Sequence, residues 1–307
     1  MKIVFLDALT LGDVDFKRFE KFGEVIIYQT TSREETLNRV KDADIVVTNK
    51  VVIDKEILDN SNIKFIQIAA TGMNNVDLEY AESKGILVKN VAGYSTKSVV
   101  QQTFAFVLGL INRINYFDKY TREEYPKSKI FTHIIDWFEI SNKKWGIIGL
   151  GTIGEEVAKI AEAFGAEVVY YSTSGKNNNS SYKRVSLNEL LTTSDIISIH
   201  APLNDKTKNL IGKNELMNMK DDAVLVNLGR GGIINEKELC EVLERKNILV
   251  GLDVFEKEPI AADNPLLKFK DKTLLSPHIA WTSKEARKTL MDGIYRNIEE
   301  FINKTAN

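Results

Sequence analysis

The sequence predicts an α/β protein with two domains, each built on a doubly wound parallel sheet. Two observations predict this class. Apolar runs of strand length alternate with amphipathic runs from the first residues onward, and the alternation stops near residue 112 and restarts near residue 144. A chain of 307 residues is long enough for two domains. Such alternation is typical of βαβ units whose strands are buried on both faces.

The first half alternates expected strands with short expected helices. The strands are the apolar runs at residues 2–8, 24–30, 43–49, 64–70 and 86–91, and the helices are the amphipathic runs at 16–22, 33–40, 54–59 and 76–85. Residues 98–110 are strongly apolar but contain Gln101 and Gln102. We therefore expect a buried helix there and no membrane span.

A polar and aromatic stretch without periodicity, residues 112–145, precedes the second half. Expected strands then lie at 144–150, 166–171, 195–200, 223–228, 249–254 and 273–278, and expected helices lie at 155–164, 187–193, 214–219 and 237–244. The Asn-rich residues 172–181 read as a surface loop. Residues 283–303 read as one amphipathic helix.

The composition argues against several kinds of partner. A formal net charge of −2 gives no electrostatic attraction to nucleic acid or to an anionic membrane. The one cysteine, Cys240, forms neither an internal disulfide nor a metal cluster, so we expect no metal and a reducing compartment. Asp7 interrupts the N-terminal apolar run early, and no small-residue cleavage site follows. This favours a first strand over a signal peptide, and a cytoplasmic location.

A glycine-rich turn lies where the alternation restarts. Gly149, Gly151 and Gly154 follow a strand and open a helix, and a second strand comes next. This context favours a dinucleotide site over an unliganded turn. Gly149 would permit the tight turn, Gly151 would let the backbone approach a pyrophosphate, and Gly154 would let the helix pack closely. The amides of the first helical turn, at Thr152 and Ile153, would face the phosphates.

No acidic residue follows the next strand, where an Asp or Glu would bond the adenosine ribose of NAD. That strand is followed by Ser172, Thr173, Ser174 and Lys176. The hydroxyls could bond a 2′-phosphate, and Lys176 could pair with it. The loop could also be a polar segment that tolerates either cofactor. Both NAD(H) and NADP(H) therefore stay open, with NADP(H) slightly favoured.

Further motifs extend the pattern to nearly the whole chain. They are HAPLN at residues 200–204, VNLGRGG at 226–232, LDVFEKEP at 252–259 and SPHIAW at 276–281. With the glycine loop, they resemble the D-isomer-specific 2-hydroxyacid dehydrogenase family. ATGMNNVD at residues 70–77 is similar to the family's substrate loop. This segment and PHIAW look most like the glycerate dehydrogenase (hydroxypyruvate reductase) branch.

The resemblance implies a catalytic trio at Arg230, Glu258 and His278. These residue types fit the reduction of a 2-keto acid, hydroxypyruvate or glyoxylate by preference, in which negative charge develops on the carbonyl oxygen. Protonated His278 would supply the proton, and Glu258 would stabilise the charged imidazole. Arg230 would hold the substrate carboxylate through two hydrogen bonds. In the oxidation direction, neutral His278 would accept the hydroxyl proton.

Each of these residues could instead have a structural role. Arg230 could lie in a surface turn, and Glu258 could be solvated, since Glu256 is two residues away. A lone histidine after a strand is more often structural, but His278 ends a strand at the edge of the sheet where ligands bind. His133 lies in the aperiodic stretch, and we assign it no chemistry.

The resemblance also implies further binding residues. Those implied for the cofactor are His200, Pro202, Leu228 and Asp253, and those implied for the substrate, besides Arg230, are Thr71, Gly72, Met73 and Trp281. In the simpler interpretation, Asp253 only caps its strand. The resemblance suggests instead that Asp253 forms a hydrogen bond with the nicotinamide amide of the cofactor. Backbone amides at Thr71, Gly72 and Met73 could bind a carboxylate. An ordinary turn capped by Asp77 is the alternative there.

The order of the segments implies a discontinuous organisation. Residues 1–97 and 283–307 would form a flavodoxin-like substrate domain, and residues 98–282 a Rossmann dinucleotide-binding domain inserted in it. The stretch at 112–145 would form the contact of a homodimer, because the family is usually dimeric. The expected partner is a small 2-keto or 2-hydroxy acid, with no nucleic acid and no membrane.

Three other functions stay open. A regulatory protein of this fold could bind a dinucleotide without turnover, although the intact trio argues against it. A formate dehydrogenase-like relative would pair the histidine with an amide in place of Glu258. A methyltransferase would share the glycine loop but not the trio. The chain departs from the family in lacking the ribose acid, and at residues 99–103, where relatives commonly carry Ala-Glu.

Overall fold

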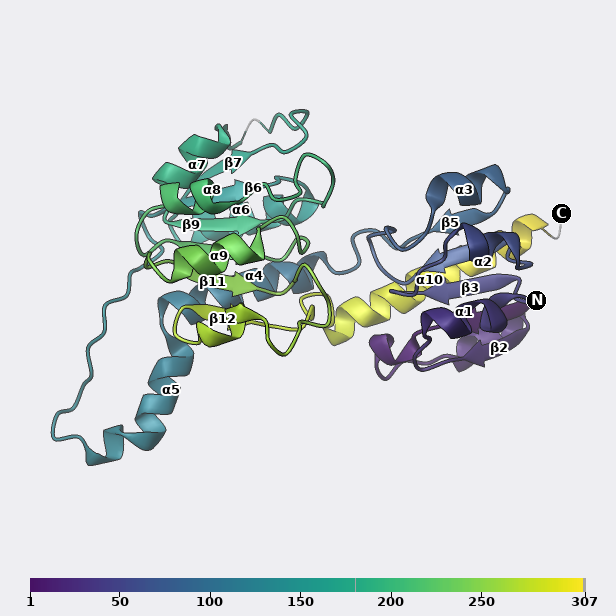
Figure 1. Ribbon diagram of the computed structural model, residues 1–307, viewed down its shortest axis with the longest axis horizontal. Coiled ribbons are helices and arrows are strands. Elements are labelled where there is room, and N and C mark those ends of the chain that lie inside the picture. Colours follow the sequence, from purple (N-terminus) through teal and green to yellow (C-terminus); the bar gives the residue numbers. More distant parts are fainter. Residues whose placement is uncertain (180, 306–307) are drawn as a thin grey trace. The chain divides into compact units, whose positions relative to one another are not determined.

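A computed structural model describes residues 1–179 and 181–305 (Figure 1). The chain divides into two compact units. The first combines Met1–Ser95 with Trp281–Asn307, and the second is Thr96–Ala280. The boundaries expected from the sequence lay two residues further along the chain, at 97/98 and 282/283. Both units carry a parallel sheet, as the sequence predicts.

The sheet of the first unit has the strand order β2-β1-β3-β4-β5, which is the flavodoxin-like order. Its strands are β1 (Lys2–Phe5), β2 (Glu24–Ile27), β3 (Ile45–Thr48), β4 (Phe65–Ile68) and β5 (Leu87–Lys89). Its helices are α1 (Arg33–Val40), α2 (Lys55–Asp59), α3 (Leu78–Ser83) and α10 (Lys284–Thr305), with 3-10 turns at Ala8–Leu11 and Lys17–Phe22. Each expected strand of this half is therefore present.

The C-terminal helix returns to this sheet, as the spacing of its apolar residues predicts. Leu290, Ile294 and Ile298 are fully buried and pack with residues of β1, β3 and β4. Gly293 lies so close to Val91 that an added Cβ would approach the valine side chain to 2.5 Å. The helix therefore belongs to the first unit's core, although it begins at Lys284, 195 positions after that unit's last strand ends at Lys89.

The sheet of the second unit has the order β12-β11-β10-β9-β6-β7-β8. The strands are β6 (Lys144–Ile148), β7 (Glu167–Tyr171), β8 (Lys183–Arg184), β9 (Ile196–Ile199), β10 (Val224–Asn227), β11 (Leu249–Leu252) and β12 (Thr273–Leu275). The direction of winding reverses between β6 and β9, as in the Rossmann fold, and ligands bind at the carboxyl ends of strands at such a point. The two-residue edge strand β8 was not expected from the sequence.

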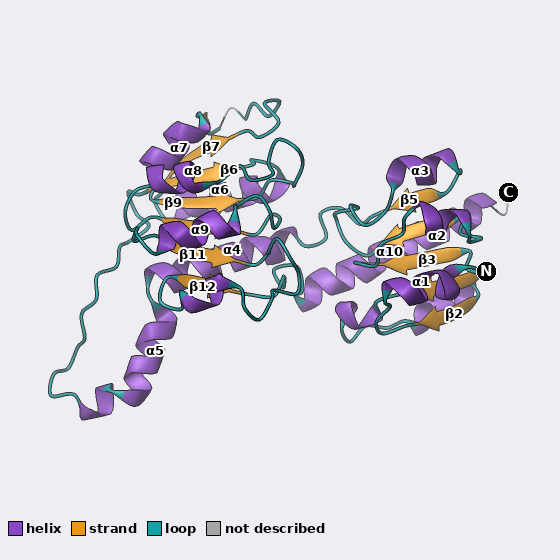
Figure 2. Ribbon diagram, in the orientation of Figure 1, coloured by secondary structure: helices purple, strands orange, loops and turns teal. Residues whose placement is uncertain are grey.

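Helices cover both faces of this sheet (Figure 2). The helices are α4 (Thr96–Ile111), α5 (Ile114–Glu123), α6 (Thr152–Ala163), α7 (Leu187–Thr193), α8 (Lys213–Asn218) and α9 (Glu236–Leu243), with 3-10 turns at Tyr125–Lys127 and Pro265–Lys268. One core contains residues of α4 and α6, and the other contains residues of α7, α8 and α9. The buried helix expected at residues 98–110 is thus confirmed as α4.

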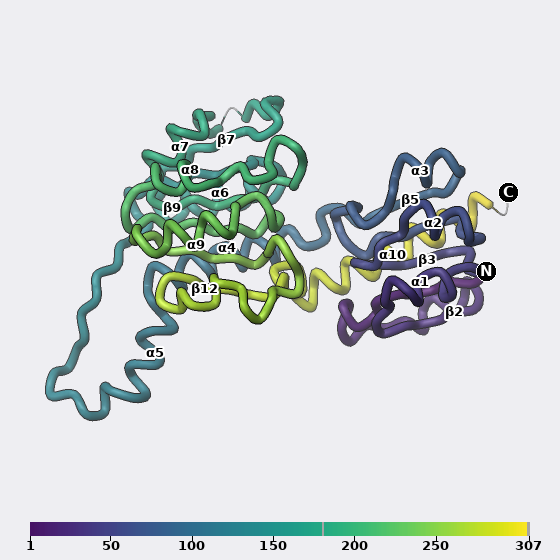
Figure 3. The backbone as a smooth tube through the Cα atoms, in the orientation of Figure 1, coloured from purple at the N-terminus to yellow at the C-terminus, as the bar shows by residue number. Residues whose placement is uncertain are grey.

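An arm leaves the body of the second unit. It consists of α5 and residues 124–139, and Figure 3 shows its path. No residue of α5 is buried. The arm exposes Ile130, Ile134 and Trp137, and Phe131 is 90% exposed. Residues of the arm therefore present apolar surface that this chain does not cover.

No helix in the described part of the chain is long and apolar enough to cross a membrane.

Candidate active site

The three residues of the predicted trio follow three neighbouring strands. Arg230 comes after β10, Glu258 after β11 and His278 after β12, and these strands pair with one another in parallel. Their carboxyl ends therefore lie along one edge of the sheet, where ligands of such folds bind.

His278 and Glu258 are in direct contact. Nδ1 of His278 lies 2.7 Å from Oε2 of Glu258, and the other carboxylate oxygen, Oε1, accepts a hydrogen bond from the Phe255 amide at 3.1 Å. The side chains are 21% and 31% exposed, so solvent or a ligand can reach them. With its proton on Nδ1, the imidazole donates to Glu258 and its orientation is fixed. Nε2 is then the nitrogen that can exchange a proton with a substrate.

Asp253 holds the turn that carries His278. Its carboxylate accepts hydrogen bonds from the hydroxyl of Ser276 at 2.5 Å and from the amides of Ile279 and Ala280 at 2.8 and 2.9 Å. Its carbonyl accepts from the His278 amide at 2.8 Å. Asp253 is only 1% exposed, and this burial raises its pKa.

His278 itself has a left-handed backbone, with φ of 54°. Non-glycine residues rarely adopt this conformation, and it persists where surrounding contacts impose it. The bonds to Asp253 supply those contacts and so aim the imidazole. Asp253 thus acts within the chain as the cap that the sequence suggested. Its bond to the nicotinamide amide stays a prediction.

Arg230 lies in a tightly packed loop beside this pair. Its guanidinium donates to the Gly229 carbonyl at 2.8 Å, and the side chain of Asn227 bonds the Gly229 amide and the Arg230 carbonyl. A Cβ at Gly231 would lie 1.8 Å from the Phe255 carbonyl oxygen. The Arg230 loop and the Glu258 loop therefore touch, backbone to backbone.

A separate pocket of about 590 Å³ lies over the glycine turn. It is lined by Gly149, Leu150, Gly151, Ser172, Thr173, Ser174, Lys176, Asn177, His200, Pro202, Asn204, Asp205 and Lys206. These residues follow β6, β7 and β9, the strands at which the winding reverses. The pocket therefore occupies the expected dinucleotide position.

The three glycines of the turn differ in what surrounds them. Gly149 has a φ of 92°, and a Cβ there would lie 2.9 Å from the Ala201 amide. A Cβ at Gly154 would lie 2.4 Å from the Gly149 carbonyl oxygen. Gly151, by contrast, has open space at its Cβ position: apart from its own segment of backbone, no atom of residues 1–179 and 181–305 lies within 4 Å. Gly151 caps the N-terminus of α6. The open space therefore lies where the backbone amides of the first helical turn would face a bound anion.

Two side chains of this pocket carry unused hydrogen-bonding atoms. Ser172 Oγ and both ring nitrogens of His200 are buried and have no partner within residues 1–179 and 181–305. Buried polar groups are ordinarily satisfied. Burial lowers the pKa of His200 to about 3, so its ring is neutral at physiological pH. Unused donors and acceptors beside an open helix N-terminus fit a large polar ligand such as a nicotinamide dinucleotide.

The pocket contains most, but not all, of the predicted cofactor residues. Thr152, Ile153 and Gly154 lie in the first turn of α6, while Leu228 and Asp253 are buried at the ends of β10 and β11 and do not line the pocket. Asn177, Asn204, Asp205 and Lys206 line it and were not anticipated. Asn204 ends the HAPLN motif of residues 200–204, and Asp205 and Lys206 directly follow it. That motif was the signal that could have identified them.

The predicted substrate loop lies in the first unit, after β4. Asp77 caps α3 by accepting from the Tyr80 amide at 3.1 Å, as the alternative interpretation expects. The side chain of Asn90 donates to the Thr71 carbonyl at 2.5 Å. The Trp281 ring packs edge-on against Tyr94, with centroids 6.2 Å apart. Binding of substrate by Thr71, Gly72, Met73 and Trp281 stays a prediction.

No cluster of three or more His, Cys, Asp or Glu side chains in the described ranges is arranged to hold a metal ion. The one cysteine, Cys240, is buried, and burial raises the pKa of its thiol to about 11.

Known proteins resemble this chain in sequence and in fold. The family model for the NAD-binding domain of D-isomer-specific 2-hydroxyacid dehydrogenases matches residues 104–280. A hydroxypyruvate reductase from Blautia hydrogenotrophica is 40% identical over 314 residues, covering 98% of this chain and 97% of the relative. A glycerate dehydrogenase from Methylorubrum extorquens is 35% identical over 308 residues, covering 98% and 96%.

Among solved structures, an acyclic imino acid reductase in complex with NADPH and D-Arg has a TM-score of 0.88 and 30% identity, covering 99% of this chain and 98% of that chain. The motifs, the two parallel sheets and these matches agree with one another. The chain belongs to the D-isomer-specific 2-hydroxyacid dehydrogenase family.

Proposed function

We propose that the protein reduces small 2-keto acids to D-2-hydroxy acids, with hydroxypyruvate and glyoxylate as the favoured substrates. The observation that carries the proposal is the contact of 2.7 Å between His278 and Glu258, on the same sheet edge as Arg230. The names of the relatives, hydroxypyruvate reductase and glycerate dehydrogenase, support this substrate class.

Arg230, His278 and Glu258 each have a separate role in this reaction. A nicotinamide dinucleotide, when bound in the pocket over the glycine turn, would supply the hydride for the carbonyl carbon. The Arg230 guanidinium binds the substrate carboxylate through paired hydrogen bonds. The protonated imidazole of His278 donates from Nε2 to the carbonyl oxygen as negative charge develops there. Glu258 keeps the ring in place through Nδ1 and stabilises its positive charge. The oxidation of a D-2-hydroxy acid reverses these steps.

For the cofactor, we propose that both dinucleotides are accepted and that NADP(H) is slightly preferred. No acid follows β7, and Lys176 and Lys206 line the pocket together with Ser172. Their charges and the free hydroxyl favour a 2′-phosphate. Asp205 also lines the pocket and opposes this preference, which keeps the predicted difference small.

A spectrophotometric screen tests the activity and the cofactor together. Hydroxypyruvate, glyoxylate and pyruvate are offered with NADH and with NADPH in parallel. Turnover with at least one of the first two substrates is expected, faster than with pyruvate. Tight dinucleotide binding without turnover of any keto acid would contradict the proposal and favour the regulatory alternative.

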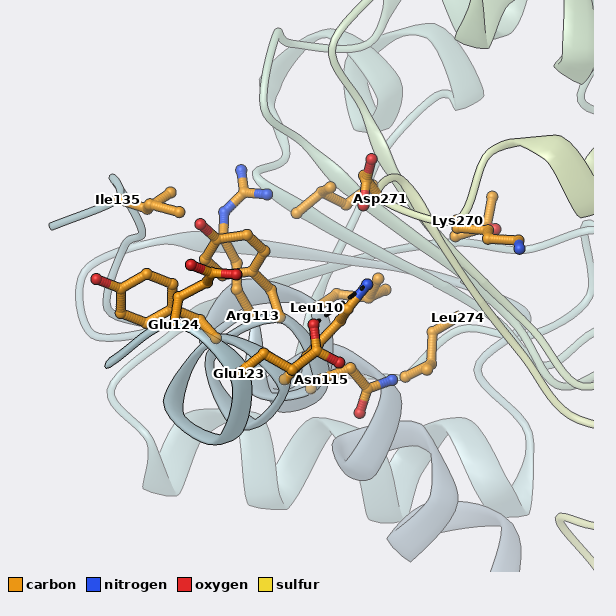
Figure 4. A pocket seen from close by; sticks show the side chains of 15 residues that line it. Leu110, Arg113, Asn115, Glu123, Glu124, Ile135, Lys270, Asp271 and Leu274 are labelled. Atoms are coloured by element: carbon orange, nitrogen blue, oxygen red, sulfur yellow. Dashed lines mark ion pairs between the residues drawn. The ribbon is translucent and has the colours of Figure 1, made fainter. Parts of the chain in front are cut away.

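We propose also that the protein is a homodimer formed through the arm. A groove of about 670 Å³ runs between α5 and the end of the sheet at β12. Its charged lining is balanced: Arg113, Lys119 and Lys270 against Glu123, Glu124 and Asp271. Figure 4 shows α5 side chains on one side of the groove and those of residues 270–274 on the other.

A second copy of this chain fits such a groove. A two-fold dimer places the same patch on both subunits, so a balanced lining complements itself. The exposed apolar residues Ile130, Phe131 and Ile134 would be covered by the same contact. Sedimentation at micromolar concentration is expected to give a dimer, and Phe131→Ser is expected to weaken it. A monomer of the unmodified protein at that concentration would refute the arrangement.

A cytoplasmic location stays a prediction.

A further inference from the structure

The loop that carries Glu258 is fastened at both ends to one carboxylate. Glu236, the first residue of α9, accepts a hydrogen bond from the Glu256 amide through Oε1 at 2.5 Å. Its other oxygen, Oε2, accepts from the side chain of Asn264 at 3.2 Å. Glu256 returns the contact, since its Oε1 accepts from the Glu236 amide at 2.9 Å. Glu258 lies between the two attachment points.

The attachment points are themselves rigid. Asn235 caps α9 by accepting from the Glu238 amide at 3.1 Å, and one face of α9 is buried through Leu239 and Leu243. Asn264 accepts from the Leu266 amide at 2.9 Å and so caps the 3-10 turn that follows the loop. The carboxylate of Glu236 therefore connects two fixed elements across the segment that holds Glu258.

The carboxylate of Glu236 also interacts electrostatically with that of Glu258. Glu236 is half-buried, and this burial, together with the nearby carboxylates of Glu256 and Glu258, raises its pKa. The interaction of two charges is mutual, so Glu236 adds negative potential at Glu258. Glu258 contacts His278 directly, the charge of Asp253 interacts with that of His278, and Arg230 lies in the loop that touches the Glu258 loop.

We propose that Glu236 is a positioning residue for the Glu258–His278 pair. It fixes the loop on which Glu258 is carried and so holds the Glu258 carboxylate in contact with His278. The effect on turnover rests on the proposed function, whereas the effect on the environment of the His278 ring does not. Glu236 touches neither substrate nor cofactor in this account.

The substitution Glu236→Gln separates these effects from a change of size. Glutamine keeps one acceptor oxygen but presents an NH₂ group where a second acceptor is needed, and it removes the charge. The matched control is Glu241→Gln. Glu241 lies on the same helix, is exposed and pairs with Lys213, away from the loop. Glu256→Gln weakens the same attachment from its other side.

The experiment follows the ring signals of the three histidines of the full-length protein by NMR at constant pH, with His278 assigned from His278→Asn. In Glu236→Gln the ring signals of His278 are expected to shift and broaden at constant pH relative to the unmodified protein, because the carboxylate that contacts Nδ1 is no longer held in one position. Glu256→Gln is expected to have the same effect, and Glu241→Gln to leave the His278 signals in place. In keto-acid reduction, kcat of Glu236→Gln is expected to fall about tenfold while dinucleotide affinity is retained.

His278 ring signals in Glu236→Gln that match those in Glu241→Gln would overturn the inference, whatever the activity. Absence of turnover in the unmodified protein would instead overturn the proposed function, and the NMR comparison would still decide the role of Glu236. Thermal unfolding establishes that each variant is folded. If Glu236→Gln does not fold, the comparison of Glu256→Gln with Glu241→Gln decides the question by the same criterion.

Discussion

The imidazole of His278 contacts the carboxylate of Glu258 at 2.7 Å across 20 positions of sequence. Each residue lies in a turn that follows one of two adjacent parallel strands, β12 and β11. The contact is reinforced from both sides, because Asp253 fixes the histidine turn and Glu236 fixes the glutamate loop. An imidazole held in this way keeps one tautomer and one orientation, which is what general acid catalysis would require of it.

Arg230→Lys tests the paired contact with the substrate carboxylate. Lysine keeps the positive charge but cannot form two parallel hydrogen bonds. We expect kcat/KM for hydroxypyruvate to fall by about 100-fold, or ~2.7 kcal/mol, with thermal stability nearly unchanged. Steady-state kinetics measures this change. Unaltered kcat/KM would remove Arg230 from substrate binding.

Gly151→Ala tests whether the open space above α6 belongs to the cofactor. In the described part of the chain, no atom outside the neighbouring backbone lies within 4 Å of the added Cβ, and Gly151 has a φ of −94° that alanine tolerates. We therefore expect an unfolding temperature within about 2 °C of the original. Dinucleotide affinity, measured by calorimetry, is expected to fall about tenfold or more because the methyl group meets the pyrophosphate.

The control for this substitution is Gly154→Ala, whose Cβ would lie 2.4 Å from the Gly149 carbonyl oxygen. It is expected to lower stability as well as affinity. A Gly151→Ala protein with undiminished affinity would mean that the cofactor phosphates bind elsewhere.

Ser172→Asp tests the choice between the two dinucleotides. An acid at the end of β7 would bond the ribose hydroxyls of NAD and repel a 2′-phosphate. The ratio of kcat/KM for NADH to that for NADPH is expected to rise about tenfold or more. Thr173→Ser, which adds no charge, is the control. A ratio equal to that of the control would show that Ser172 does not face the ribose.

His200→Asn tests the buried, neutral imidazole through stability. Burial lowers the pKa of His200 to about 3, whereas the unfolded chain has the ordinary value near 6.5. Between these values the unfolded state binds a proton that the folded state does not. The stabilising contribution is therefore complete above about pH 6.5 and is lost as pH falls toward 3, at up to about 1.4 kcal/mol per pH unit.

Asparagine does not titrate in this range. Denaturant unfolding of the two proteins at several pH values is expected to show the unmodified protein losing stability more steeply between pH 6 and pH 4, roughly as linkage requires. Parallel stability curves would show that the His200 ring accepts a proton in the folded state.

Much of this organisation follows from local patterns in the sequence. Strands buried on both faces have continuous apolar runs, so β1, β3, β4, β6, β9, β10 and β11 could be recognised individually. Parallel strands align their carboxyl ends, so motifs after successive strands were expected to share one edge. The fold and the family were predicted on this basis and are confirmed. The catalytic and binding roles of the individual residues stay predictions.

Other features depend on contacts that no local pattern encodes. The role of Asp253 as an anchor depends on amides 26 and 27 positions away, and Glu236 meets Glu256 20 positions away. Asp205 brings an acid into the cofactor pocket from the loop after β9, although the sequence after β7 carries none. The edge strand β8 has two exposed residues and hence no apolar signal.

The central claim is that His278 is the proton donor and not a structural residue. His278→Asn tests it most directly, because asparagine tolerates the left-handed backbone at this position, where φ is 54°. Hydroxypyruvate reduction and dinucleotide affinity are measured on the same preparation. We expect turnover to fall by about 1,000-fold or more with affinity unchanged within about twofold. Turnover near that of the unmodified protein, or loss of dinucleotide binding together with turnover, would contradict the account.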